Sequence, residues 1–313
     1  MLNLVVVADR EWRGEIQNRL DNVGRYHASR TILCAVERGR TTIDAWATMT
    51  GEEEVKPGEL AVCHEQVVLE VGETHLDHLE TIVDPLVVTD LATLVWSPHG
   101  HAEAVDSLLD LAQIVLIDSV NEPDSTSAVA RAGTLAERAY IVDLAWLRST
   151  PWRERVASTF DPPEWRDDLA LISEVTVRHR PDSAIAGLLF FGWLCKRLDW
   201  KPGSMLTQNG TMHGTAESRR QEVKLHLEPD PTMNAPGLAG ITIETASGHE
   251  ISLNRGAGGL KARRKDRKGR EWEWTVMGAS RGEAGILGEG IRQALLRDKS
   301  YGPALKAARM MVS

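Results

Sequence analysis

Short apolar runs alternate with amphipathic stretches through the first half of the chain. Leu4 to Val7 and Leu94 to Trp96 are continuous apolar runs, typical of strands that are buried on both faces. From Ala102 to Leu111 the apolar residues instead recur about every 3.6 positions, which predicts a helix with one apolar face. Because strands that alternate with helices usually pair in parallel, this pattern predicts an α/β domain with a mostly parallel sheet and flanking helices.

Other stretches continue this alternation to about residue 160. Further strands are predicted at Thr31–Val36, Leu60–Val71, Ile114–Ile117 and Tyr140–Val142, and further helices at Trp12–Val23, Leu76–Ile82 and Ser127–Ala136. An acidic segment at residues 51–58 has the glycine and proline content of a loop.

The pattern changes near residue 200, where Lys201-Pro202-Gly203 and Gln208-Asn209-Gly210 are strong turn signals. We predict a first domain over residues 1–200, including a strand at Ile172–Val177 and an apolar helix at Asp182–Leu198. The second domain, residues 201–313, is predicted to be smaller and of the α+β type. Its strands form an antiparallel meander at residues 222–227, 240–245, 249–254, 259–264 and 271–276, and a C-terminal helix spans Glu283–Leu296.

The composition of the 313 residues limits the possible classes of protein. A hydrophobic share of 42% is enough for buried cores, and a formal charge of -9 argues against general nucleic-acid binding. The longest apolar run, Ala184 to Cys195, is shorter than the ~20 residues that cross a bilayer, so no membrane segment is expected. Cys34, Cys63 and Cys195 form no CxxC pair, so we expect reduced thiols in the cytoplasm and no cysteine zinc site.

No phosphate-binding motif follows the first predicted strand. Residues 8–12 read Ala-Asp-Arg-Glu-Trp where a dinucleotide-binding protein would have its glycine-rich turn, and no GxxxxGK[ST] motif occurs. The glycines at residues 256–259 lie between two strands of the meander and indicate a hairpin turn. No nucleophile elbow or hydrolase triad is evident. The scaffold is typical of enzymes, yet the sequence predicts neither a catalytic residue nor a cofactor.

The turn from Ser97 to His101 is the most site-like segment, because it lies between a predicted strand and a predicted helix. Three interpretations stay open. The segment is a structural turn, or it binds an anion or sugar phosphate through Ser97, His99, His101 and the free N–H groups of the helix start. In the third interpretation the two histidines bind a metal, but no third ligand stands at a diagnostic spacing. We therefore assign no metal ligand.

A segment rich in tryptophan and arginine follows at residues 146–153. Arg148 and Arg153 could form an anion pocket with Ser97 and His99; alternatively, these arginines form salt bridges while the tryptophans pack inside. The chain has 10 Trp against 3 Phe and 3 Tyr, and tryptophans near loops can anchor a protein partner. Together with Trp96 and Trp152, this composition predicts an exposed docking surface at one edge of the sheet.

Residues 261–270 form a strongly basic segment with seven Lys or Arg and one Asp. Asp266 to Gly269 is predicted to be the turn of a hairpin, and Trp272 and Trp274 share one face of the strand that follows. Three interpretations stay open: a solvated hairpin, a docking site for an acidic protein partner, and a nucleic-acid-binding element. The net acidity of the chain weighs against the last.

Four segments together resemble one known family. They are residues 96–100 (Trp-Ser-Pro-His-Gly), 140–153, 160–163 (Phe-Asp-Pro-Pro) and 282–287. Over nearly the whole chain they look like the glucose-6-phosphate dehydrogenase assembly protein family (OpcA), actinobacterial type. The resemblance implies a non-catalytic subunit that assembles or activates this dehydrogenase in the oxidative pentose phosphate pathway, and so serves NADPH supply.

The resemblance has two further implications. The dehydrogenase, as the partner, would bring the NADP site and the catalytic histidine. Cyanobacterial members are linked to thioredoxin control through cysteines, and only Cys34 and Cys63 could serve this purpose here.

The leading hypothesis is a cytoplasmic assembly factor or allosteric activator of glucose-6-phosphate dehydrogenase, built from a Rossmann-like α/β domain and a small α+β domain. One alternative is a sugar-phosphate-binding module or enzyme that uses the Ser97–His101 turn and Arg148. The other is nucleic-acid binding through the 261–270 hairpin. A sugar phosphate could also be an effector under the leading hypothesis. The predicted partner- or anion-binding residues are Trp96, Ser97, His99, His101, Arg148, Trp152 and Arg153.

Overall fold

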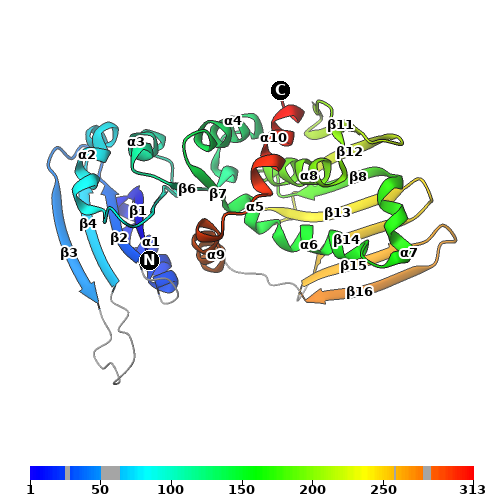
Figure 1. The fold of residues 1–313 in the computed structure, drawn as a ribbon, viewed down its shortest axis with the longest axis horizontal. Coiled ribbons are helices and arrows are strands. Elements are labelled where there is room, and N and C mark those ends of the chain that lie inside the picture. Colours follow the sequence, from blue (N-terminus) through cyan, green and yellow to red (C-terminus); the bar gives the residue numbers. More distant parts are fainter. Residues whose placement is uncertain (25–28, 51–63, 257–258, 278–282) are drawn as a thin grey trace, which may run out of the picture. The chain divides into compact units, whose positions relative to one another are not determined.

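The computed structural model describes residues 1–24, 29–50, 64–256, 259–277 and 283–313, and the chain divides into two compact units. The first unit comprises residues 1–121, 134–144 and 282–297, and the second comprises residues 122–133, 145–281 and 298–313. Each unit contains its own sheet, as the ribbon in Figure 1 shows. The acidic segment at residues 51–58 and Cys63 lie outside the described residues.

Seven strands form the sheet of the first unit, in the order β3-β4-β2-β1-β5-β6-β7. They are β1 (Leu2–Asp9), β2 (Ser29–Val36), β3 (Asp44–Thr50), β4 (His64–Val71), β5 (Thr93–Trp96), β6 (Ile114–Ile117) and β7 (Tyr140–Asp143). Only the edge strand β3 is antiparallel to its neighbour; it was not predicted. Apart from β3, the first strand β1 lies in the centre of the sheet. The strands β2 and β4 follow on one side of it, and β5, β6 and β7 follow on the other. This is the strand order of dinucleotide-binding folds, so the predicted mostly parallel α/β sheet is confirmed.

Short helices connect these strands. The helices of the first unit are η1 (Arg10–Trp12), α1 (Arg13–Gly24), η2 (Glu73–His78), α2 (Leu79–Val83), η3 (Asp84–Leu86), α3 (Ala102–Ser107), η4 (Leu108–Asp110), η5 (Ser119–Asn121) and α9 (Glu283–Leu296). The predicted helix at residues 283–296 is confirmed, but its place is not the one expected. It contacts α1 and β7 instead of the meander, because its apolar stripe of Leu287, Ile291 and Ala294 is buried in the first unit.

Nine strands form the sheet of the second unit. They are β8 (Ile172–His179), β9 (Lys201–Pro202), β10 (Leu206–Gln208), β11 (Thr211–Glu217), β12 (Glu222–Pro229), β13 (Leu238–Thr245), β14 (Glu250–Gly256), β15 (Gly259–Lys265) and β16 (Glu271–Met277). Their order is β10-β11-β12-β8-β13-β14-β15-β16, with β9 paired to β11. Apart from the parallel pair of β8 and β12, all pairs are antiparallel. The predicted meander is confirmed from β13 to β16, but the predicted strand at residues 222–227, which is β12, pairs with β11 and β8 and not with β13.

The strand β8 is a correction to the sequence analysis, which placed it in the first domain. It lies in the middle of the second sheet, where Val175 stands between Leu225 and Ile243. The reason is visible in its pattern: β8 alternates buried and partly exposed residues, whereas the strands of the parallel sheet are buried almost throughout.

Helices cover the apolar face of the second sheet. The helices here are α5 (Leu144–Arg148), α6 (Thr150–Thr159), α7 (Pro163–Arg166), η6 (Asp167–Leu171), α8 (Ala184–Leu198) and α10 (Tyr301–Met311), while α4 (Ser125–Ala136) contains residues of both units. The backbone of α8 at Gly187 comes close to the side chains of Leu227 and Val177. The helix α10, which was not predicted, packs against α8. Among the described residues, no helix is long and apolar enough to cross a membrane.

Candidate functional site at the carboxyl edge of the parallel sheet

The strand order of the first sheet reverses at β1, because β2 lies on one side of it and β5 on the other. In open α/β sheets, ligands bind beyond the carboxyl ends of the strands at such a reversal. The two strand ends here are Asp9 and Trp96, and Ser97 follows directly. The turn from Ser97 to His101 thus lies where this fold positions a ligand.

Ser97 holds the backbone of this turn. Its hydroxyl group lies 3.1 Å from the carbonyl oxygen of Val7 and also within hydrogen-bonding distance of the carbonyl oxygen of Gly100. Gly100 and His101 have positive φ angles of 107° and 56°, which turn the chain sharply into α3. Because a hydroxyl group has one proton to donate, the protein itself already uses the donor of Ser97.

The two histidines of the turn have different surroundings. The Nε2 atom of His101 lies 3.0 Å from Oδ1 of Asp9, the last residue of β1. The ring of His99 lies 5.1 Å from the ring of Trp12, and its buried Nδ1 atom has no hydrogen-bond partner among the described residues. Burial lowers the pKa of His99, so the ring is neutral at pH 7. The Nδ1 atom of His99 is therefore available for a hydrogen bond, whereas Nε2 of His101 is already bonded to Asp9.

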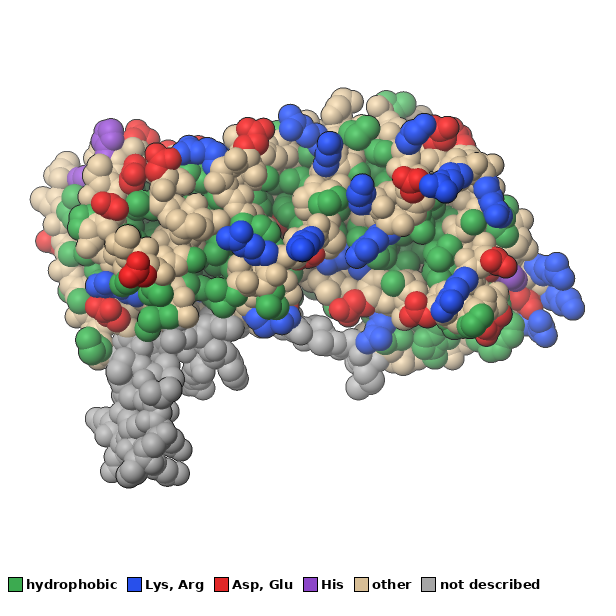
Figure 2. All heavy atoms as spheres, viewed as in Figure 1, with side chains coloured by type: hydrophobic (Ala, Val, Ile, Leu, Met, Phe, Trp, Pro, Cys, Tyr) green, Lys and Arg blue, Asp and Glu red, His purple; other side chains and the backbone are tan. Residues whose placement is uncertain are grey.

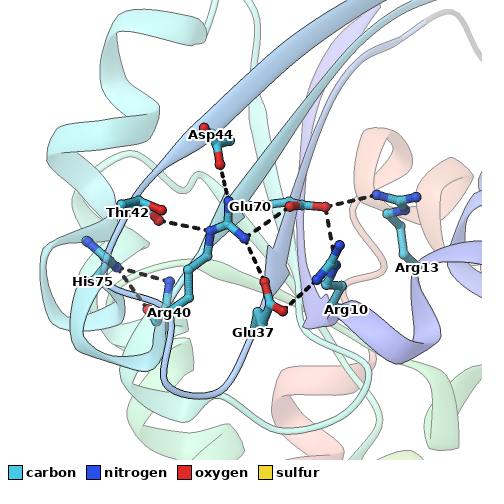
Figure 3. A network of polar contacts seen from close by, with 9 residues as sticks. Arg10, Arg13, Glu37, Arg40, Thr42, Asp44, Glu70 and His75 are labelled. Carbon is cyan, nitrogen blue, oxygen red and sulfur yellow. Dashed lines mark hydrogen bonds and ion pairs between the residues drawn. The ribbon is translucent and has the colours of Figure 1, made fainter.

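A group of ion pairs, shown in Figure 3, lies at the carboxyl ends of β1, β2 and β4. The side chain of Glu70 is 9% exposed and lies 3.1 Å from Arg13, 3.2 Å from Arg40 and 3.3 Å from Arg10. Glu37, the first residue after β2, accepts hydrogen bonds from Arg10 at 2.5 Å and from Arg40 at 2.6 Å. Two carboxylates thus join three arginines from different segments of the first unit.

The same group extends toward β3. Arg40 contacts the carboxylate of Asp44 and donates a hydrogen bond of 3.0 Å to the carbonyl oxygen of Thr42. The three arginines 10, 13 and 40 are matched by the three carboxylates of Glu37, Asp44 and Glu70, so the formal charges of the group cancel. An anion that bound here would have to displace a carboxylate, because no arginine of the group lacks one.

The residues at this edge do not fit a dinucleotide. A pyrophosphate is bound there by backbone N–H groups, and glycines let the backbone approach it. The turn after β1 instead has the Asp9 carboxylate, paired with His101. An acidic residue that follows β2 binds the ribose in such folds, but Glu37 is already bonded to Arg10 and Arg40. The geometry therefore gives no basis for hydride transfer at this edge.

The ion pairs of Glu37 lead to a prediction on acid stability. The hydrogen bond from Arg40 lowers the pKa of Glu37 most, burial partly opposes this, and Arg10 lowers the pKa further. A carboxyl group whose pKa is lowered by folding contributes stability above its ordinary value of 4.5, and this contribution is lost as the pH falls through the lowered pKa. We expect the thermal midpoint of the wild type to fall more steeply below pH 4.5 than that of Glu37→Gln.

The matched control is Glu11→Gln, which removes an exposed glutamate from the neighbouring turn. Circular dichroism melts across the pH series check the prediction. An acid dependence of Glu37→Gln as steep as that of the wild type would contradict it.

The expected exposure of the tryptophan segment is wrong. Trp96, Trp146 and Trp152 are each 2% exposed and Arg153 is 7% exposed, while Arg148 is half-buried at the end of α5. Trp96 is part of the first sheet, and the others belong to the second unit. Side chains buried to this degree offer little surface, so a contribution of Trp96, Trp152 or Arg153 to partner binding stays a prediction.

Arg153 instead joins three helices of the second unit. Its guanidinium lies 3.4 Å from the centre of the Trp146 ring, and it donates hydrogen bonds to the Trp146 carbonyl oxygen at 2.8 Å and to Thr150 at 3.0 Å. The indole N–H of Trp146 donates to Asp298 at 2.8 Å, just before α10. Burial lowers the pKa of Arg153 to about 9, and the charge of Asp298 partly opposes this, so the guanidinium stays charged at neutral pH. These contacts stabilise the packing of α5, α6 and the start of α10.

The described cysteines do not form a redox site. Cys34 and Cys195 are free and buried, and burial raises the pKa of each thiol to about 12. A thiol with such a pKa forms little of the reactive thiolate near neutral pH. In the described ranges, no group of three or more His, Cys, Asp or Glu residues could hold a metal ion.

The sequence analysis also missed a polar cluster in the second unit. Asp168 accepts hydrogen bonds from Ser247 at 2.9 Å and from His249 Nδ1 at 2.7 Å, and Trp165 packs on His249. The three polar residue types are those of a hydrolase triad, but Ser247 and Asp168 lie on the same nitrogen of the histidine. A triad needs them on opposite nitrogens, so we interpret the cluster as structural.

Two family models match this chain. One family model, described as the glucose-6-phosphate dehydrogenase subunit N-terminal domain (OpcA), matches residues 21–134. The model of the corresponding C-terminal domain matches residues 139–305. Relatives provisionally named OxPP cycle protein OpcA are 27% identical over 186 residues in Synechococcus elongatus and 29% identical over 154 residues in a Synechocystis species. These alignments cover 58% and 48% of this chain but only 40% and 32% of the two relatives, so the chain spans less than half of their length.

Among solved structures, the chain is similar to an oxidoreductase from Bacillus cereus, with 10% identity and a TM-score of 0.52. The alignment covers 99% of this chain and 94% of that one. At this identity the likeness shows the fold alone, which agrees with the strand order of the first sheet.

Proposed function

Because the chain belongs to the OpcA family of glucose-6-phosphate dehydrogenase subunits, we propose that it is a non-catalytic subunit that binds this dehydrogenase and promotes its assembly or active conformation. The match of both parts of the chain to the family carries the proposal. The ion pairs at the carboxyl edge of the first sheet support it, because in the described part of the chain they occupy the edge where such folds bind a cofactor. The two free cysteines that the structure describes support action in the cytoplasm.

The physical basis of such activation is differential binding. A subunit shifts the dehydrogenase toward its active state only if it binds that state more tightly than the inactive one. Coupling of this kind typically changes an affinity by roughly 5- to 150-fold. The same coupling requires that substrates which favour the active state also tighten the binding of the subunit.

The proposal predicts a saturable change in the dehydrogenase when the purified chain is titrated into it. We expect a larger particle in analytical ultracentrifugation, together with a change in KM or kcat that saturates at the same ratio of the two proteins. The control is the chain alone with glucose 6-phosphate and NADP, which should produce no NADPH. A dehydrogenase whose size and kinetics stay unchanged would overturn the proposal, and turnover by the chain alone would overturn its non-catalytic part.

His99 favours a second candidate, a sugar phosphate that acts as an effector at the Ser97–His101 turn. The buried Nδ1 atom of His99 lacks a described partner at the position where this fold binds ligands. Isothermal titration with glucose 6-phosphate should then give a binding signal that His99→Ala removes. A flat titration of the wild type would exclude this candidate and leave the first proposal intact.

A further inference from the structure

The strand β16 is an edge of the second sheet. Among the described strands it pairs with β15 alone, over seven residues from Glu271 to Met277. An edge strand presents unpaired backbone N–H and C=O groups, and proteins usually protect long edges with charges, prolines or bulges. On β16 the charged residues Glu271 and Glu273 lie on one face, whereas the other face has two large aromatic side chains, Trp272 and Trp274.

Both tryptophans are exposed to solvent because the helix α7 covers the neighbouring strand β15 and does not extend over β16. Trp272 and Trp274 are 44% and 39% exposed, although they stand opposite Arg264 and Ala262, which are 8% and 2% exposed. On β15 the guanidinium of Arg264 lies 3.9 Å from the ring centre of Trp165 in α7. The cover by α7 thus extends over β15, and the aromatic face of β16 beside it remains accessible.

The turn between β15 and β16 has a fixed shape. Asp266 Oδ1 accepts hydrogen bonds from the backbone N–H of Lys268 at 2.8 Å and of Arg270 at 2.9 Å, and Gly269 has a φ of 78°. The side chains of Arg267 and Lys268 are exposed at the tip and make no ion pair with any described residue. Figure 2 shows Lys and Arg side chains gathered at this end of the second sheet.

The charges of the hairpin favour a protein over a nucleic acid. Arg263 is paired with Glu250 at 2.5 Å and with Glu271 at 3.1 Å, and Arg270 is paired with Asp266 at 2.7 Å. The cations of the hairpin without a described ion-pair partner, Lys261, Lys265, Arg267 and Lys268, belong to a chain with a formal charge of -9, which weighs against nucleic-acid binding. Arg267 and Lys268 beside two tryptophans suit a segment that combines carboxylates with apolar side chains.

We infer that β16 binds an extended acidic segment of the dehydrogenase, which adds to the second sheet as a further strand. Its backbone pairs with the free edge of β16, its apolar side chains contact Trp272 and Trp274, and its carboxylates lie beside Arg267 and Lys268. Strand addition gives affinity through the backbone and specificity through alternate side chains. This inference rests on the proposed function, because it names the surface by which the subunit binds its enzyme.

The test measures the dissociation constant of the fluorescently labelled chain and the dehydrogenase. We expect Trp272→Ala/Trp274→Ala and Arg267→Glu/Lys268→Glu each to weaken binding at least ~10-fold, as is typical of aromatic and charged centres of an interface. The charge-reversal variant should also bind with a smaller dependence on salt. It involves only exposed side chains, so it decides the question even if the tryptophan variant fails to fold.

Two control variants alter the opposite side of the same sheet. Leu206→Ala changes a 73% exposed residue of β10, the other edge strand, and Arg219→Glu/Arg220→Glu repeats the charge reversal in the turn between β11 and β12. Both should bind within ~2-fold of the wild type, because surface changes away from an interface cost little.

Each outcome decides the inference. If the wild type binds the dehydrogenase and the tryptophan and charge-reversal variants bind equally well, the inference is wrong and the proposed function stands. If the wild type does not bind the dehydrogenase, both the inference and the proposed function are wrong. If the charge reversal abolishes binding of a labelled single-stranded oligonucleotide but leaves the dehydrogenase affinity unchanged, the hairpin is a nucleic-acid site and the inference is overturned.

Discussion

Arg153→Ala is expected to lower the free energy of unfolding of the second unit by ~1.5–3 kcal/mol, the range for losing hydrogen bonds that involve a charged group. The variant loses the stacking of the guanidinium on Trp146, at 3.4 Å, and the hydrogen bonds to the Trp146 carbonyl oxygen and Thr150. It also removes the positive charge of Arg153 from the surroundings of the half-buried Asp298. These losses add up at one place because a single side chain joins α5, α6 and the start of α10.

Arg155→Ala is the matched control, because it removes a less buried arginine from the same helix. Its effect on the free energy of unfolding should stay within about 0.5 kcal/mol, as for most surface substitutions. Arg153→Lys should recover little of the loss, because an ammonium group lacks the planar fork that stacks and donates at the same time. Urea denaturation followed by tryptophan fluorescence measures all three variants. Equal stability of Arg153→Ala and Arg155→Ala would show that the buried guanidinium contributes nothing beyond its surface counterpart.

Gly192→Ala is expected to destabilise the second unit by ~2 kcal/mol or more, against the gain of about 1 kcal/mol that alanine normally brings to a helix. Gly192 lies in α8 where α10 crosses it. A Cβ atom at this position would overlap the carbonyl oxygen of Ala304 and stand 3.2 Å from the backbone nitrogen of Ala308. Neither atom belongs to a flexible side chain, so the two helices would have to move apart.

The control for this prediction is Gly302→Ala in α10. No atom lies within 4 Å of the Cβ that it would add, so the free energy of unfolding should rise by up to about 1 kcal/mol. Chemical denaturation measures whether each variant raises or lowers the free energy of unfolding. If Gly192→Ala stabilised the protein as Gly302→Ala does, the close approach of α8 and α10 would be refuted.

Sequence reasoning found the Ser97–His101 turn because a strand and a helix bounded it. It did not find the ion pairs of Glu37, Arg40 and Glu70. Arg40 follows Glu37 by three positions, which is a visible local signal, but Glu70 comes from another strand. The buried tryptophans were misjudged for a related reason: their segment lies close to predicted loops, and proximity to a loop does not reveal which other elements pack over it.

The meander from β13 to β16 was predicted well, since glycine turns and alternating residues mark each of these strands, but β8 was not expected between β12 and β13. What could not be predicted was which end of the sheet stays uncovered. Trp272 and Trp274 have the same alternating pattern as the buried residues of β15. Only the position of α7 over Arg264, and not over β16, makes them a surface.

The sequence by itself determined most of the local elements, though not β3 or α10, because hydrophobic periodicity and turn residues act over a few positions. It also carried the family resemblance, which the family models confirm for both parts of the chain. Only the tertiary structure decided that β8 lies in the second sheet, that α9 packs in the first unit, and that the tryptophans of residues 146–153 are interior. These outcomes depend on contacts between residues far apart in the chain, and such contacts are set by the burial of whole faces and not by any short pattern.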